Sequence, residues 1–129
     1  MLDTRPHWKS TYNQMVVRSA PLVPAPDEHI NRIFRALADP TRRDIIRRTL
    51  ARESTVSELA AAYDMSFAAV QKHVAVLEGA GLVTKHASGR ERIVGGNPDA
   101  IRRAQSLLDG YEQIWRGRVA RLDALLAGD

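Results

Sequence analysis

The chain has 129 residues, which is enough for one domain of ordinary size with a tail beside it but not for a second core. Its 19 basic and 15 acidic side chains give a net charge of +4, which is compatible with a polyanionic partner, and the absence of cysteine excludes disulfides and thiolate chemistry. No apolar run approaches the roughly 20 residues of a membrane span and no signal peptide begins the chain, so we expect a cytoplasmic protein without membrane contact.

The first 26 residues are rich in proline. Each proline ring removes an N–H donor and restricts the residue before it, so we predict that residues 1–26 form an extended or flexible arm. Met1 and Met15 are both candidates for the true start, and the role of the arm stays open. A single folded domain is expected over residues 27–127.

Two helices are predicted at the beginning of the domain. Apolar residues recur with helical spacing from Asp27 onward. Asp39 offers an N-cap for the second helix, and Pro40 occupies its first position, where no N–H is needed. The residues expected to face the core are Ile30, Ile33, Phe34, Leu37 and Ala38 in the first helix and Ile45, Ile46, Thr49 and Leu50 in the second.

Residues 55–78 have the pattern of two helices joined by a short turn. Thr55 and Glu58 have the spacing of a capping box, which starts the first of the pair. Ser66 is the expected N-cap of the second, and Gly81 is placed to follow its end in a left-handed conformation. The buried face of the second helix is predicted to consist of Val70, Val74 and Leu77.

A β-hairpin and a long helix complete the domain. Residues 82–86 and 91–95 are typical of two strands joined by a glycine-containing turn. Asn97 is the expected N-cap of a helix over about residues 98–127. Its apolar residues recur at spacings of three and four with only Arg118 interrupting, a heptad-like seam that needs a partner helix. The seam consists of Ile101, Ala104, Leu108, Tyr111, Trp115, Leu122 and Leu125.

This order of elements predicts a mainly α fold with a small β-hairpin, a winged helix-turn-helix that places one helix in the major groove of double-stranded DNA. Gln71 can form a paired hydrogen bond to adenine, and Lys72 can reach a guanine or a phosphate. Arg90 and Arg92 flank a glycine turn that can enter the minor groove as a wing. The expected DNA contacts are Ser66, Phe67, Ala68, Ala69, Gln71, Lys72, His73, Lys85, Arg90 and Arg92.

Several of these residues also have a simpler interpretation. A lone helical histidine such as His73 is more often a packing residue or a phosphate contact than a metal ligand. The arginine-rich face of residues 42–52 is most simply a solvated surface, and Asp44 is expected to be a solvated charge. The pair of Tyr111 and Trp115 fits the core of a dimer better than a ligand cage.

Four blocks of sequence follow one another in a specific order: ALADPTRR at 36–43, VSELA at 56–60, Met65-Ser66 with VQKHVAVLE at 70–78, and AGLV at 80–83. In this order, from about Ile30 to Leu126, the chain resembles the ArsR-type winged-helix repressors. The resemblance implies a homodimer, joined through its first and last helices, that binds an imperfect palindrome in an operator. The residues expected at the dimer interface are Ile30, Phe34, Ile101, Leu108, Tyr111, Trp115 and Leu122.

The chain also resembles a branch of that family with Tyr-Glu-x-x-Trp in the last helix, here Tyr111, Glu112 and Trp115. Metal-sensing members carry cysteines near the helix before the turn or Asp and His pairs on the last helix. This chain has no cysteine, and none of its four histidines lies on the last helix, so we predict no metal site and no cofactor. The inducer is left open between a small molecule, a redox-independent signal and none.

Two other classes of function are alternatives to a regulator. A winged-helix module can lose specific DNA binding and bind another protein instead. The polar and basic residues retained at the expected DNA contacts, such as Gln71 and Arg90, argue against this. An enzyme is the weakest alternative, because the sequence has no phosphate loop, no HExxH motif and no nucleophile signature. The operator, the regulated genes and the direction of control do not follow from the sequence.

Overall fold

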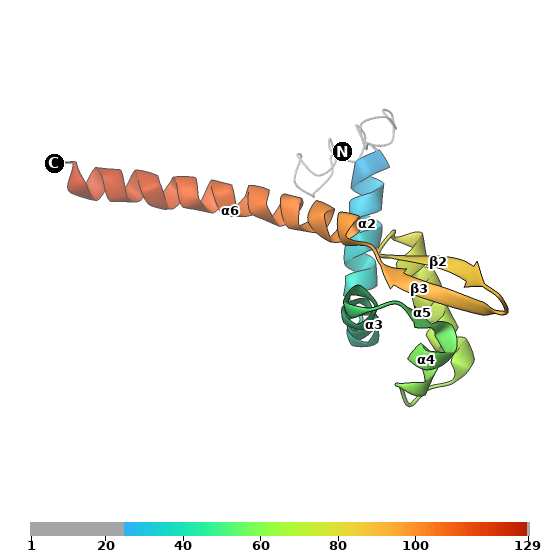
Figure 1. Ribbon diagram of the computed structural model, residues 1–129. Coiled ribbons are helices and arrows are strands. Elements are labelled where there is room, and N and C mark those ends of the chain that lie inside the picture. Colours follow the sequence, from blue (N-terminus) through green and yellow to red (C-terminus); the bar gives the residue numbers. More distant parts are fainter. Residues whose placement is uncertain (1–24, 129) are drawn as a thin grey trace, which may run out of the picture.

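The structure is a computed structural model that describes residues 25–128 (Figure 1). The predicted arm of residues 1–26 therefore lies outside the described residues, apart from its last two positions. The elements in chain order are α2 (Ala25–Leu37), α3 (Pro40–Ala51), β1 (Ser54–Thr55), α4 (Val56–Ala61), α5 (Phe67–Gly79), β2 (Val83–Ser88), β3 (Glu91–Gly96) and α6 (Pro98–Ala127).

The core lies between the short helices and one face of the sheet. The apolar spacings correctly predicted its central residues, since Ile33, Ile45 and Leu77 are fully buried. Two predicted core positions are wrong. Ala38 is exposed because α2 ends at Leu37, and Ala36 is buried instead. Leu50 in the last turn of α3 is 47% exposed and lies over Gly96, where a Cβ atom would come within 2.7 Å of its Cδ2.

The helix starts are fixed by the caps that the sequence predicts. The Asp39 carboxylate accepts the Arg42 N–H at 3.0 Å, and the Ser66 hydroxyl accepts the Ala69 N–H at 3.1 Å. The reciprocal bonds of the capping box at Thr55 and Glu58 are both present. Each cap satisfies N–H groups that have no partner inside the helix, and this explains why the chain leaves one helix and enters the next at these residues.

Helix α2 begins at Ala25, two residues earlier than predicted. Pro26 is tolerated there because the first turn of a helix needs no N–H donor. Further along α2, His29 Nε2 lies 2.9 Å from the Ala80 carbonyl oxygen and fastens α2 to the end of α5. Gly81 follows with φ +75°, the left-handed conformation expected for the residue after this helix.

The sheet has three strands in the order β1-β3-β2, all antiparallel. The hairpin of β2 and β3 was predicted, and its turn contains Gly89 at φ +63°. The edge strand β1 was not predicted; it pairs Ser54 with Val94 and Thr55 with Ile93. It joins the start of the helix-turn-helix to the base of the hairpin and so fixes the position of one relative to the other.

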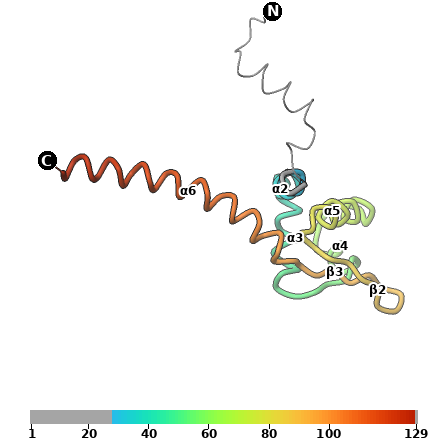
Figure 2. The backbone as a smooth tube through the Cα atoms, turned by 90° about the horizontal axis from the view of Figure 1, so that it is seen from above, coloured from blue at the N-terminus to red at the C-terminus, as the bar shows by residue number. Residues whose placement is uncertain are grey.

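Helix α6 is 30 residues long and leaves the domain on the side opposite to the tip of the β2–β3 hairpin (Figures 1 and 2). Only its first turns pack on the domain, through the buried Ala100 and Ala104. No helix within residues 25–128 combines the length and the apolar character needed to cross a membrane.

Candidate nucleic-acid interface

Helices α4 and α5 form the helix-turn-helix, and the core fixes the rotation of α5 about its own axis. Val70, Val74 and Leu77 are buried, so the opposite side of α5 is turned to the solvent. The predicted contact residues on that side are indeed exposed: Phe67, Ala68, Gln71 and Lys72, with Ser66 before them. Phe67 is 47% exposed, which is unusual for a large aromatic side chain and leaves its ring available to a partner.

Gln71, the residue predicted to contact adenine, and the wing face a common hollow of about 140 Å³. Phe67 and Gln71 line it from α5, and Arg90 and Arg92 line it from the hairpin. The structure therefore brings together four predicted site residues that lie about twenty positions apart in sequence. Glu91 lies between the two arginines in the same lining, so the hairpin side carries two positive charges and one negative charge. With an exposed amide on the other side, the groove can accept both a phosphate backbone and a base edge.

Sequence reasoning missed part of this hollow. Thr55, Val56 and Ser57, at the start of α4, form its third side. Thr55 and Ser57 are polar residues at a helix N-terminus, a signal that predicts the helix start but was not used to assign contacts. The unpredicted strand β1 brings them next to the hairpin.

The other six predicted contact residues do not line this hollow. Ser66, Ala68 and Lys72 are exposed beside it on α5 and the turn before it, and Ala69 is partly buried. Lys85 and His73 have partners elsewhere. Lys85 Nζ is 3.6 Å from Glu78 Oε1, so its charge already has a partner at the end of α5. His73 is partly buried, and its Nδ1 lies 3.4 Å from Arg42 Nη1 and 4.0 Å from Asp39 Oδ2. The structure thus places His73 against the start of α3, in agreement with the packing role weighed for it.

Two arginines of α3 form hydrogen bonds to the end of α2 that the sequence did not predict. Arg42 donates from Nε to the Ala36 carbonyl at 2.8 Å, and Arg43 donates from Nη1 to the Leu37 carbonyl at 2.7 Å. Carbonyls at a helix C-terminus have no partner inside the helix, and these two guanidinium groups supply one. Arg42 and Arg43 therefore join the end of α2 to the start of α3 rather than forming a merely solvated surface.

Asp44 is likewise not a solvated charge. Its carboxylate accepts the Tyr63 hydroxyl at 2.6 Å, Arg48 Nε at 2.8 Å and Arg47 Nη2 at 2.6 Å. The Tyr63 hydrogen bond, followed by those from Arg48 and Arg47, holds the pKa of Asp44 well below its usual range. Burial, and then the bond to Asp44, raises the pKa of Tyr63 to about 12. This network ties α3 to the turn of the helix-turn-helix.

Replacing Tyr63 by phenylalanine is expected to lower the free energy of unfolding at neutral pH by about 1.5 kcal/mol, because one hydrogen bond to a charged group is lost. The pKa of Tyr63 is about 12 in the folded protein and about 10 in the unfolded chain. The contribution of Tyr63 to the free energy of unfolding is therefore complete below pH 10 and is lost as the pH rises from about 10 to about 12. Asp44 has its pKa lowered, so its contribution is present above about pH 4 and lost in acid. Urea unfolding across this pH range measures both losses.

The matched control for this experiment is the double variant with Asp44→Asn. If the hydroxyl acts through the carboxylate, Tyr63→Phe should cost much less in the Asp44→Asn background than in the wild type. An equal loss in both backgrounds, or an alkaline loss of stability that Tyr63→Phe leaves unchanged, would show that the two groups are not coupled.

Comparison with known proteins adds to this geometry. Residues 37–86 match a family described as a helix-turn-helix domain. The uncharacterised HTH-type transcriptional regulator YuzN of Bacillus subtilis is 40% identical over 86 residues, which cover 61% of this chain and 90% of that protein. The crystal structure of an ArsR family transcriptional regulator is 36% identical, with a TM-score of 0.66 over 69% of this chain and 92% of that one.

More distant structures share the fold. An ArsR-like transcriptional regulator from Rhodococcus sp. RHA1 is 26% identical, with a TM-score of 0.67 over 76% of this chain and 92% of its own. A homodimeric winged helix-turn-helix DNA-binding domain from Mycobacterium bovis is 21% identical, with a TM-score of 0.58 over 70% of this chain and 85% of its own. At that identity the likeness concerns the fold alone, which is the winged helix-turn-helix predicted from the sequence.

Proposed function

Since this chain belongs to the ArsR family of helix-turn-helix transcriptional regulators, we propose that it is a repressor that binds a palindromic operator as a homodimer. The observation that carries the proposal is the common hollow of α5 and the wing, where Gln71 faces Arg90 and Arg92. Helix α5 would lie in the major groove, and the hairpin would reach the neighbouring minor groove. A repressor of this kind acts by occupying DNA that the transcription machinery needs.

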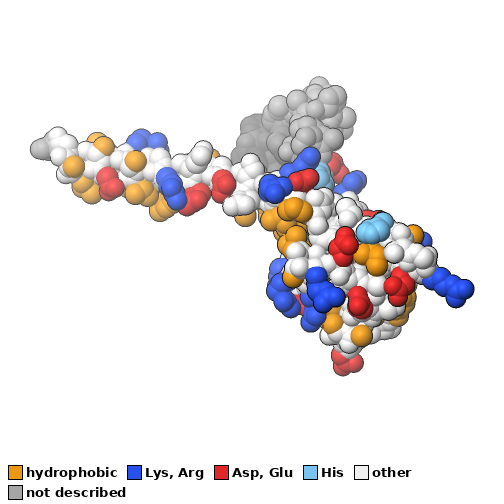
Figure 3. Space-filling view, viewed as in Figure 1, with side chains coloured by type: hydrophobic (Ala, Val, Ile, Leu, Met, Phe, Trp, Pro, Cys, Tyr) orange, Lys and Arg blue, Asp and Glu red, His pale blue; other side chains and the backbone are white. Residues whose placement is uncertain are grey.

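The exposed apolar side of α6 supports the homodimer. Leu108, Tyr111, Trp115 and Leu122 are each at least half exposed, and Figure 3 shows hydrophobic side chains along the length of this helix. An apolar stripe of this length on a single chain marks an interaction surface. Ile30, Phe34 and Ile101, the other predicted interface residues, already pack against the core of their own domain, so they would border the interface.

The apolar stripe on α6 is more continuous than the heptad-like seam predicted from the sequence, which Arg118 interrupts. Val119 follows Trp115 by four residues and precedes Leu122 by three, so it fills the gap attributed to Arg118. Arg118 lies at the side, with its guanidinium carbon 5.6 Å from the centre of the Trp115 ring. Leu122 still follows Trp115 by seven residues, so the heptad spacing of Leu108, Trp115 and Leu122 is unbroken, and the two α6 helices of the dimer would keep a left-handed supercoil.

We also place this chain among members of the family that do not sense metals. The sequence has no cysteine, and α6 carries no histidine. Within residues 25–128, no three His, Asp or Glu side chains lie close enough together to hold a metal ion. A titration with Zn²⁺ that leaves operator binding unchanged is the expected result, and release of the operator by the metal would contradict the assignment.

Selection of bound sequences from a random pool of DNA tests the proposed function. We expect two inverted half-sites whose centres are one helical turn, about 10 base pairs, apart or a multiple of it. The full-length protein with Gln71→Ala and Arg90→Ala together serves as the control and should enrich no sequence. A pool that stays random with the wild type would refute specific binding. Repression would be refuted if deletion of the gene for this protein lowered the transcript level of the genes next to its operator.

A further inference from the structure

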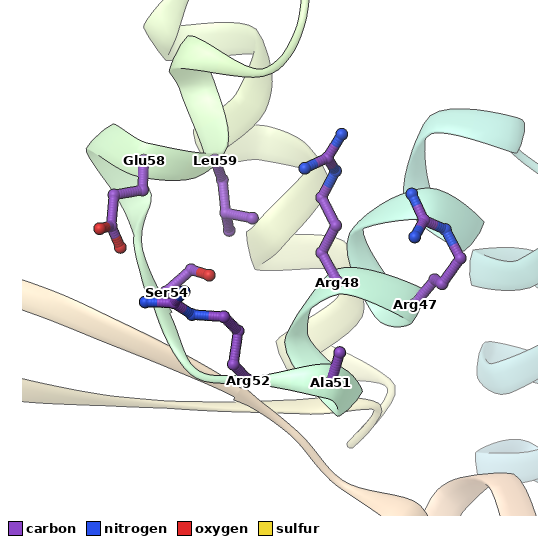
Figure 4. Close-up of a pocket in the computed structure, with 7 residues that line it drawn as sticks. All are labelled: Arg47, Arg48, Ala51, Arg52, Ser54, Glu58 and Leu59. Carbon is purple, nitrogen blue, oxygen red and sulfur yellow. The ribbon is translucent and has the colours of Figure 1, made fainter.

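A second cleft, of about 330 Å³, lies between the end of α3 and the start of α4 (Figure 4). Arg47 and Arg48 of α3 line one side, residues of β1 and α4 line the other, and Arg52, the C-cap residue of α3, extends toward Ser54 (Figure 4). It is lined by Arg47, Arg48, Ala51, Arg52, Ser54, Glu58 and Leu59. None of these residues belongs to the hollow assigned to DNA or to the stripe on α6, so the cleft has no part in the function proposed above.

We call this cleft the arginine cleft. Its guanidinium groups have more N–H donors than the hydrogen bonds found among the described residues. Arg47 and Arg48 each donate to Asp44, which leaves part of each five-donor fork free. Arg52 has no carboxylate within 4 Å among the described residues and contributes only its backbone N–H to the end of α3. Glu58 is the one acid in the lining, and its Oε1 accepts the Thr55 N–H at 2.8 Å in the capping box.

We propose that the arginine cleft binds a small organic anion, a carboxylate or a phosphate ester, that weakens the binding of DNA. A planar guanidinium fork matches both of these groups. The volume falls at the lower end of the range usual for small-molecule sites, and Leu59 adds an apolar contact for the carbon skeleton of the ligand. The regulatory half of this inference rests on the proposed function, whereas the binding of the anion does not.

The cleft and the DNA hollow lie on two sides of the same short segment. Ser54 and Glu58 line the cleft, and the three residues between them, 55–57, line the hollow. An anion in the cleft therefore adds negative charge beside the surface that DNA phosphates approach. It also competes with Asp44 for Arg48, and Asp44 holds Tyr63 in the turn before α5. Both effects disfavour bound DNA, so the ligand would act as an inducer.

Binding is tested on the full-length protein without DNA, with inorganic phosphate as the probe at constant ionic strength. We expect the arginine Nε–Hε signals of Arg47, Arg48 and Arg52 to shift in nuclear magnetic resonance spectra as phosphate is added. Arg52→Gln should weaken this binding at least tenfold. Arg102→Gln is the matched control, because Arg102 is exposed and paired with Asp99 at the start of α6, and it should bind phosphate like the wild type. Equal binding by Arg52→Gln and the wild type would overturn the anion site.

Regulation is tested with the selected operator. Phosphate should lower the operator affinity of the wild type and of Arg102→Gln at least threefold more than that of Arg52→Gln. An equal effect on all three proteins would mean simple competition by salt and would overturn the regulatory role. If Arg52→Gln itself weakens DNA binding in phosphate-free buffer and lowers its salt dependence, the cleft contacts the DNA backbone instead of a free anion. A protein that binds phosphate but no DNA would refute the proposed function and leave the anion site standing.

Discussion

Trp115→Ala is expected to convert the proposed dimer into monomers at micromolar concentration. In the single chain the indole is 57% exposed in the middle of the apolar stripe on α6, so in the proposed dimer the partner helix would bury it. Truncation of a buried tryptophan to alanine costs about 3–5 kcal/mol, which raises the dissociation constant of the dimer at least about a hundredfold. Sedimentation equilibrium of the purified protein measures this change directly.

The same substitution should lower operator affinity, because a monomer can hold only one half-site at a time. Gln113→Ala is the matched control, since residue 113 lies on the side of α6 opposite to Trp115 and outside the stripe. It should leave both the dimer and the operator affinity unchanged. If Trp115→Ala sediments as an unchanged dimer, the indole lies outside the interface and the assignment of this stripe is wrong.

The parts of this fold that could be predicted are those encoded by neighbouring residues. The caps at Asp39 and Ser66 and the left-handed Gly81 each depend on a few consecutive positions. The spacing of apolar residues fixes which side of each helix is buried, so the exposure of Gln71 followed from the burial of Val70 and Val74. Local chemistry and core packing agree here, as expected for a sequence that specifies one fold.

The parts that could not be predicted depend on residues far apart in the chain. Strand β1 has only two residues, and it exists because β3, about forty positions later, supplies its hydrogen bonds. The carboxylate of Asp44 meets the hydroxyl of Tyr63 across 19 positions, so no spacing rule relates them. In the candidate site, the approach of Arg90 to Gln71 depends on the same β1–β3 pairing.

Lys85 illustrates how such contacts change a site prediction. Its position beside the glycine turn made it a candidate for DNA contact, but the register of the hairpin places it opposite Val94, well back from the turn. There its ammonium group faces Glu78 of α5. The arginines closest to the turn, Arg90 and Arg92, remain as the cations of the wing, and they carry the electrostatic part of the last prediction.

Gln71→Ala and Arg90→Ala are expected to weaken operator binding in different ways. Gln71 presents an amide on the exposed face of α5, so its loss should cost about 1–3 kcal/mol per half-site at the preferred sequence while binding to random DNA stays unchanged. Arg90 acts mainly through its charge, so Arg90→Ala should weaken binding to both kinds of DNA and reduce the slope of log K against log salt by about 1 per protomer, or about 2 for the dimer. Titrations at several salt concentrations separate the two.

The control for this pair is Arg102→Ala, which removes one positive charge at the start of α6 and measures the effect of net charge alone. Its operator affinity should stay close to that of the wild type. If Arg90→Ala only matches this control, Arg90 does not contact DNA, and any contact of the wing must come from Arg92. If Gln71→Ala instead weakens binding to random and selected DNA equally, Gln71 contacts the backbone. The reading of bases would then depend on Lys72 and the small residues at the start of α5.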